Sequence, residues 1–280
     1  MKKYDVKRDE AIKIFKLAFK NCCTDCTDSV EDSIEDSVED SIEDSVEDII
    51  GLKIKKLELE QQTDFSPKPP VPLPQSNFIW VFLGPSYSGK SYSIVWLLYD
   101  PVTKLRDIFK KMYLFSPSAK NDSTYRMLLK DDNAQVFTDV HEFDSRLEEI
   151  LEPRKKLAEK EKFDQIEQAL LIFDDCVGSI SKNITTLTTN YRHFGLSIMF
   201  GVQAFRSINN IIRSQASNWS IFNLRKDTEE KKVFEELSGQ YYNIKKLYKE
   251  ATKGEHDFLY LNIRKSEAWR NFETKLKVNQ

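Results

Sequence analysis

The chain has 280 residues, of which 40% are hydrophobic and 31% charged, and its formal net charge is −3. This length and composition predict one large domain or two small ones with a substantial buried core. No apolar run is long enough to cross a membrane, and the N-terminus lacks the apolar stretch and cleavage site of a secretory signal. We therefore expect no transmembrane segment and no secretion. The four cysteines form no disulfide framework, which favours a reducing, intracellular environment.

Residues 1–27 are predicted to contain a basic amphipathic helix over residues 5–20, because apolar side chains recur there at helical spacing with lysines between them. Such a helix could contact nucleic acid, an anionic membrane or a partner protein, or simply pack on the main domain. Cys22, Cys23 and Cys26 follow it with metal-ligand spacing. No second pair of cysteines or histidines lies nearby in the sequence, so we do not expect a zinc site.

Residues 28–50 are an acidic low-complexity segment built on five tandem copies of Asp-Ser-(Val/Ile)-Glu. A four-residue period overshoots the helical turn by about 40° per copy, so we predict disorder or weak helicity. Residues 28–48 carry a charge of −11 in a chain whose total is −3, so all other residues together carry +8. A basic body with an acidic tail suggests a polyanionic partner. The tail either competes with that partner for the basic surface or is a solubilising spacer.

Residues 51–76 comprise a short charged segment and a proline-rich stretch, SPKPPVPLP, which we interpret as a stiff polyproline II linker. A folded domain is therefore predicted over residues 77–280. Within it, strand patterns alternate with helical patterns, which indicates an α/β sheet.

The domain opens with a phosphate-binding loop. The apolar residues 78–83 are expected to form a buried strand, and residues 92–99 a helix. Between them lies GPSYSGKS, which matches G-x-x-x-x-G-K-[ST] in the strand–loop–helix context that this motif requires. The backbone N–H groups would bind nucleotide phosphates, Lys90 would reach the β- and γ-phosphates, and the Ser91 hydroxyl would ligate Mg²⁺. The predicted loop residues are Gly84, Pro85, Ser86, Tyr87, Ser88, Gly89, Lys90 and Ser91.

A second motif, ALLIFDD at residues 169–175, is an apolar run that ends in paired carboxylates, as in the Walker B pattern. We predict a central strand beside the phosphate-loop strand. Asp174 would hold Mg²⁺ through water or Ser91, and Asp175 would act as the general base that deprotonates the attacking water.

The sequence between the two motifs predicts strands at residues 111–115 and 134–138, then a charged helix over residues 143–162 that Pro153 could break. These intervening strands favour the ATPase branch that has an extra strand between the two Walker strands.

Residues 195–202 form a further predicted strand that ends in Gln203, where a polar side chain would lie near the γ-phosphate and sense hydrolysis. Arg192 and Arg213 are candidates for an arginine finger acting in trans, or else are surface or DNA-facing arginines. The other predicted elements are helices at residues 179–194, 208–213, 227–237 and 245–251, a strand at 219–224 and a closing strand at 257–263.

Four stretches together resemble a known family: GPSYSGKS, ALLIFDD, NYRHFGLSIMFGVQ with NNIIR after it, and FLYLNIRKSEAWRNF. They are similar to the viral genome-packaging ATPases of the FtsK–HerA superfamily, the poxvirus-type packaging ATPases of large DNA viruses, virophages and related elements. The resemblance covers about residues 77–275. Its most specific part is the Arg-His pair that precedes a strand ending in Gln.

The resemblance implies a RecA-like P-loop NTPase of the ASCE type, with a central, mainly parallel sheet flanked by helices. It implies a homo-oligomeric ring, hexameric or pentameric, that uses ATP and Mg²⁺ to translocate double-stranded DNA into a preformed capsid. A capsid or portal-vertex protein would be a partner, in the virion or in the host-cell cytoplasm where viral factories lie.

By the same resemblance, Lys90 and Ser91 bind phosphate and Mg²⁺, Asp174 binds Mg²⁺, Asp175 is the base and Gln203 the sensor. Two residues depart from the usual pattern. Tyr87 replaces a smaller loop residue, and Asp175 stands where the wider superfamily has Glu. Two other functions stay open from the sequence: another P-loop DNA enzyme, such as a conjugation-type or helicase ATPase, and a nucleotide-dependent DNA or capsid scaffold without turnover.

Overall fold

The structure is a computed structural model that describes residues 69–176 and 183–278. The predicted basic helix, the cysteine cluster, the acidic repeat and the segment up to residue 68, which includes the start of the linker, lie outside the described residues. In the part of the chain that the structure describes, no helix is long and apolar enough to span a membrane.

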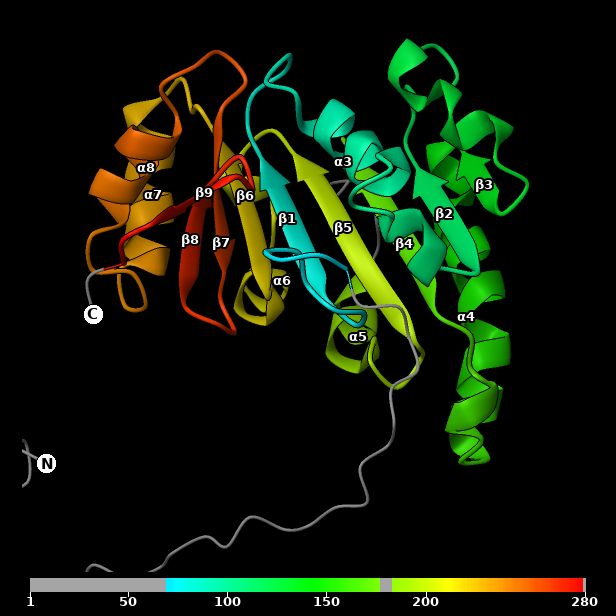
Figure 1. The fold of residues 1–280 in the computed structure, drawn as a ribbon. Helices are drawn as coiled ribbons and strands as arrows, with labels where there is room; N and C mark the ends of the chain where they lie inside the picture. The colour runs from blue at the N-terminus through cyan, green and yellow to red at the C-terminus, as the bar shows by residue number, and fades with distance from the viewer. Residues whose placement is uncertain (1–68, 177–182, 279–280) are drawn as a thin grey trace, which may run out of the picture. The chain divides into compact units, whose positions relative to one another are not determined.

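The centre of the described chain is a nine-stranded sheet in the order β3-β2-β4-β5-β1-β6-β7-β8-β9 (Figure 1). The strands are β1 (Ile79–Leu83), β2 (Lys111–Phe115), β3 (Ala134–Phe137), β4 (Ala169–Asp174), β5 (Leu196–Val202), β6 (Asn218–Phe222), β7 (Phe258–Asn262), β8 (Glu267–Arg270) and β9 (Thr274–Leu276). The α-helices are α3 (Lys90–Tyr99), α4 (Phe143–Glu159), α5 (Asn183–Asn190), α6 (Asn210–Gln215), α7 (Asp227–Leu237) and α8 (Ile244–Ala251).

The strands from β3 to β6 pair in parallel, and β7, β8 and β9 extend the sheet in antiparallel pairing. This confirms the predicted α/β fold with a mainly parallel sheet. Strand β5 pairs with both β1 and β4, so the predicted extra strand lies between the two Walker strands. The narrower prediction that β4 lies beside β1 is wrong for the same reason.

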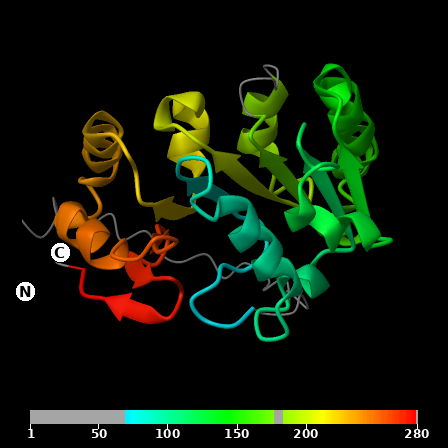
Figure 2. The ribbon, with the colours of Figure 1, turned by 90° about the horizontal axis from the view of Figure 1, so that it is seen from above.

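Both faces of β1 are buried, which explains why its sequence is a continuous apolar run rather than an alternating one. Ile79, Val81 and Leu83 face the core that α4 to α8 cover. Trp80 and Phe82 face the core under α3. Figure 2 separates these layers, with α3 on one side of the sheet and α4, α5, α6 and α7 on the other.

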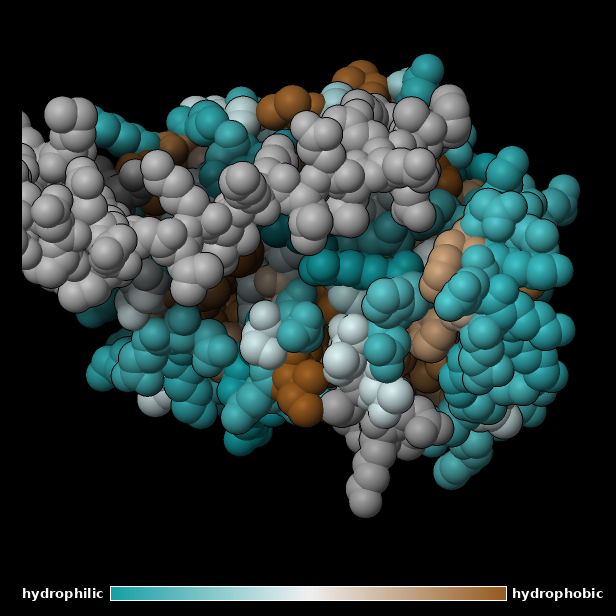
Figure 3. Space-filling model, turned by 90° about the horizontal axis from the view of Figure 1, so that it is seen from below, coloured by the Kyte–Doolittle hydropathy of each residue, from teal (hydrophilic) through white to brown (hydrophobic). Residues whose placement is uncertain are grey.

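Helix α4 continues through Pro153, where the sequence suggested a break. Pro153 is exposed, so the helix carbonyl that loses its N–H partner there can bind water instead. Leu147 and Leu151 are buried before the proline, and after it Arg154 Nη1 donates to the carbonyls of Glu167 and Phe194 at 2.7 and 2.8 Å. These contacts hold the helix on both sides of Pro153. Hydrophilic side chains gather over α4 in the view from the amino ends of the parallel strands (Figure 3).

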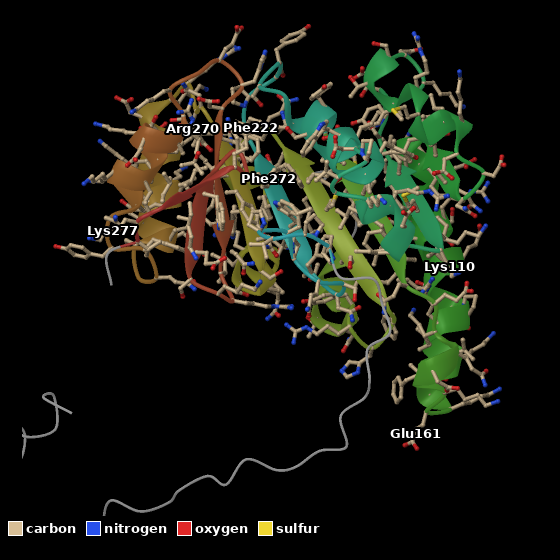
Figure 4. The ribbon with its side chains drawn as sticks, in the orientation of Figure 1. Lys110, Glu161, Phe222, Arg270, Phe272 and Lys277 are labelled. Carbon is tan, nitrogen blue, oxygen red and sulfur yellow. The ribbon has the colours of Figure 1, made fainter. Side chains whose placement is uncertain are left out.

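The C-terminal segment forms a hairpin, so β7 is not the closing strand that the sequence predicted. Its turn carries Phe272, whose ring lies 4.8 Å from Phe258, 5.0 Å from Tyr260 and 5.7 Å from Trp80 between ring centroids (Figure 4). Phe272 also stacks on Trp96 of α3, at 6.5 Å. The hairpin turn therefore packs against the helix that follows the phosphate loop.

The end of the predicted linker packs on this domain as well. Leu73 is buried in the core under α3, and the Tyr260 hydroxyl donates to the Pro72 carbonyl at 3.1 Å.

Candidate nucleotide-binding site

The phosphate loop leaves the carboxyl end of β1 and enters α3, as predicted. Gly89 closes the loop with φ 98°, a left-handed conformation that glycine adopts without steric cost. Tyr87 lies at the loop tip with φ 65° and is 93% exposed. Its ring therefore points away from the domain, and the bulky departure from the usual loop pattern displaces nothing.

Lys90 is almost fully buried at the start of α3, and its Nζ donates to the Pro85 carbonyl at 3.0 Å. Burial lowers the pKa of Lys90, while the neighbouring carboxylates of Asp175 and Asp174 oppose that shift. The ammonium thus lies inside the loop, close to both Walker B carboxylates.

Ser91 and Asp174 meet across the two motifs. The Ser91 hydroxyl donates to Asp174 Oδ2 at 2.6 Å, and Asp174 is only 2% exposed at the end of β4. The Tyr125 hydroxyl donates to the same Oδ2. Desolvation raises the pKa of Asp174, and the hydrogen bonds from Ser91 and Tyr125 oppose that shift.

Tyr125 is a site residue that the sequence did not indicate. It lies on the 3-10 helix η2 (Ser123–Arg126) between β2 and β3, and it is fully buried. Its surroundings in the sequence are polar and have no periodicity, so no local pattern pointed to a contact with β4.

Gly201 of β5 is a second such residue. A Cβ at this position would lie 1.9 Å from Asp174 Oδ1 and 2.9 Å from its Cγ. Only glycine therefore leaves room for the Asp174 carboxylate in its observed position. In the sequence, Gly201 looks like a small residue inside an apolar strand.

Asp175 faces solvent, whereas Asp174 faces inward. Asp175 has φ 52°, and its N–H donates to the Gly201 carbonyl at 3.1 Å. Gln203 Nε2 donates to Asp175 Oδ2 at 3.0 Å, and the Ser86 hydroxyl donates to Gln203 Oε1 at 3.1 Å. A chain of hydrogen bonds thus joins the phosphate loop, the predicted sensor and the predicted base.

Two buried oxygens of the site have no hydrogen-bond partner among the described residues, namely Asp174 Oδ1 and Ser88 Oγ. Oxygen ligands suit Mg²⁺, and a hydroxyl in a phosphate loop suits a phosphate oxygen. Within residues 69–176 and 183–278, no three or more His, Cys, Asp or Glu side chains gather to hold a metal. The donors present therefore fit an ion held by few protein ligands together with nucleotide phosphates.

The two predicted arginine-finger candidates lie apart from this cluster of contacts. Arg192 is exposed at the amino end of β5, where its Nε donates to the Tyr191 hydroxyl at 3.0 Å. Arg213 lines an open groove of about 990 Å³ beside α6 and α7. It donates to the Ile208 carbonyl at 2.8 Å, lies 4.6 Å from the Phe205 ring centroid and is 3.6 Å from a Glu236 carboxylate oxygen. Arg213 is thus engaged within its own subunit.

The strand order and the paired Walker motifs define the chain as a P-loop NTPase of the branch with a strand inserted between the Walker strands. Its fold is similar to that of B204, the DNA-packaging ATPase of Sulfolobus turreted icosahedral virus. The TM-score is 0.51 at 19% identity, over 69% of this chain and 96% of that one. The chain belongs to the poxvirus A32 protein family, whose model matches residues 71–249. The family predicted from the sequence is thereby confirmed.

Two further structures show weaker similarity. The genome-packaging NTPase B204 of Sulfolobus turreted icosahedral virus 2, in complex with ATP-gammaS, aligns with a TM-score of 0.46 at 19% identity, over 69% of this chain and 96% of that one. The pCW3 conjugation coupling protein TcpA, with ATPgS, also aligns with a TM-score of 0.46, at 15% identity over 66% of this chain and 57% of that one. A comparison with curated protein sequences gave no match.

Proposed function

We propose that this protein is an ATP-hydrolysing motor that moves double-stranded viral DNA into a capsid. Membership of the poxvirus A32 family supports this proposal. The observation that best supports ATP hydrolysis is the 2.6 Å hydrogen bond between Ser91 and Asp174, which joins the phosphate loop to the Walker B strand.

Each side chain has a distinct role in this proposal. Lys90 and the loop N–H groups bind the phosphates, and Ser91 and Asp174 are placed to hold Mg²⁺. Bound Mg²⁺ would neutralise the charge that develops on the phosphate oxygens. Asp175, which faces solvent, takes the proton of the attacking water.

Gln203 bridges Asp175 and Ser86, so it can report a change at the phosphate loop to the base. A shift of Ser86 on phosphate release would move Gln203 and, through it, the Asp175 carboxylate. These two hydrogen bonds support the proposal that Gln203 is the sensor.

The first experiment measures ATP hydrolysis by the full chain with and without double-stranded DNA, together with the mass of the oligomer. We expect stimulation by DNA that weakens as salt rises, because phosphate contacts release counterions. Directional movement is measured as displacement of a third strand from a duplex. Failure of DNA to stimulate hydrolysis would contradict the motor.

Variants separate binding from turnover. Lys90→Ala is expected to abolish turnover by removing the phosphate cation, and Lys231→Ala on the exposed face of α7 is its charge-matched control. Unwinding of a duplex by the wild type would instead favour a helicase. DNA or capsid binding without turnover in the wild type, unaffected by Lys90→Ala, would favour a scaffold.

A further inference from the structure

We infer that Arg225 is a cation of the nucleotide site and contacts the terminal phosphate of the ATP bound in its own subunit. The inference rests on the proposed function, because it assigns a contact within the same site. Arg225 follows β6 by three residues in the sequence, in a segment that carries no recognised motif.

The sheet order places Arg225 beside the phosphate loop. Strand β1 lies between β5 and β6, and both neighbours run parallel to it. Leu83 at the end of β1 is level with Ile221 of β6. The segment after β6 therefore leaves the sheet at the edge where the loop begins, which is where ligands bind in open α/β sheets.

Arg225 reaches the tip of the loop. Its Nη2 lies 3.4 Å from the Ser86 carbonyl oxygen, at the long end of the range for a hydrogen bond. The Ser86 hydroxyl contacts Gln203 of the β5 side. Ser86 is thus contacted by Gln203, which follows β5, and by the guanidinium of Arg225, which follows β6.

The remaining donors of Arg225 are available to a ligand. A guanidinium has five N–H donors, and the side chain of Arg225 is exposed. Among the described residues it forms no ion pair, in contrast to Arg106 with Asp131 and Arg213 with Glu236. A cation with free donors beside a phosphate loop is suited to bidentate binding of phosphate oxygens.

This assignment gives the site a cation from its own subunit. Arginines that stabilise phosphoryl transfer act either in cis or in trans. Arg213 is held by contacts within its subunit, and Arg192 lies at the amino ends of the strands. Arg225, in contrast, contacts the loop itself.

The first test compares nucleotide affinity in the full chain. Arg225→Gln is expected to weaken binding of ATP-gammaS about tenfold or more while changing ADP affinity less than about twofold, because only the triphosphate carries the contacted group. Arg225→Lys should restore part of the loss. Arg206→Gln, a change at an exposed arginine after β5, is the matched control. Equal losses for both nucleotides, or no loss, would overturn the inference.

The second test separates cis from trans. Arg225→Gln and Lys90→Ala chains are co-expressed with two different tags, and oligomers that contain both are isolated. If Arg225 acts in cis, no site in these oligomers holds both side chains, so hydrolysis stays as low as in either variant alone. Hydrolysis restored in the mixed oligomer would mean that Arg225 acts on its neighbour, and the cis assignment would be wrong.

The affinity test also separates this inference from the proposed function. A wild type that turns over no ATP would refute the motor. The effect of Arg225→Gln on the affinities for ATP-gammaS and ADP could still be measured in that case. A wild type with DNA-stimulated turnover and an Arg225→Gln variant of unchanged affinity would refute only the inference.

Discussion

Replacing Gly201 by alanine tests whether the space around the Asp174 carboxylate is as restricted as the structure indicates. The added Cβ would lie 1.9 Å from Asp174 Oδ1, more than 1 Å inside the 3.0 Å that real Cβ contacts respect. Asp174 is 2% exposed and its other oxygen accepts hydrogen bonds from Ser91 and Tyr125. Either the carboxylate or strand β5 must therefore move.

The loss in the free energy of unfolding depends on which of the two moves. If the carboxylate moves, it weakens two hydrogen bonds to a charged group, each worth about 1.5–3 kcal/mol. If β5 moves instead, overpacking a buried strand costs about 1–3 kcal/mol. We therefore expect Gly201→Ala to lower the free energy of unfolding by about 2–4 kcal/mol. Turnover should fall about a hundredfold, because Asp174, the proposed ligand of Mg²⁺, is displaced.

The assay is urea unfolding followed by tryptophan fluorescence, with ATP turnover measured on the same preparations. Gly239→Ala is the matched control, since a Cβ there meets nothing within 4 Å. In an Asp174→Ala background the clash is gone, so most of the destabilisation by Gly201→Ala should disappear there. Wild-type stability and turnover in Gly201→Ala would refute the reasoning.

Three further outcomes are expected. Asp175→Asn should abolish turnover yet bind ATP as the wild type does in a fluorescent-nucleotide titration, and wild-type hydrolysis would show that Asp175 is not the base. Asp131→Asn should cost about 1–3 kcal/mol at neutral pH, because its carboxylate receives two hydrogen bonds from Arg106, at 2.9 and 3.0 Å. Those bonds lower the pKa of Asp131, so its stabilisation is complete above the usual aspartate value of about 3.9 and is lost as pH falls below it. Urea unfolding should therefore show the gap between wild type and Asp131→Asn narrowing at pH 3, and a constant gap would contradict the ion pair. Phe272→Ala should destabilise the domain by about 2–4 kcal/mol in thermal or urea unfolding, because it removes a half-buried ring from the packing against Trp96. Its control is Tyr242→Ala, which should change stability little because that side chain is 87% exposed.

The elements with strong local signals were predictable from the sequence. The apolar runs of β1, β4 and β5 and the glycine loop each have a pattern set by neighbours in the chain. The order of β4, β5 and β1 did not follow from any of them alone, because the pairing of β1 with β5 joins residues more than a hundred positions apart. The C-terminal hairpin was missed because β8 and β9 are four and three residues long and carry charged side chains.

Site residues outside the motifs could not be predicted for a related reason. The fold places Tyr125, Gly201 and Arg225 beside Asp174 or the phosphate loop, and their local sequence gives no sign of these contacts.

The positive charge is less concentrated in the folded domain than the sequence suggested. Residues 69–280 contain 31 Lys and Arg and 27 Asp and Glu, a net charge of +4, so half of the +8 outside the acidic segment belongs to the N-terminal region.

The strands that flank β1 and the hairpin turn that packs on α3 all follow the phosphate loop in the chain. Strand β1 ends at Leu83, whereas its partners β5 and β6 begin at Leu196 and Asn218, and Phe272 packs against the core under α3. A nascent chain that has exposed the phosphate loop still lacks both neighbours of its strand. The phosphate loop therefore gains the support of both neighbouring strands only when residues 196–222 have followed it along the chain.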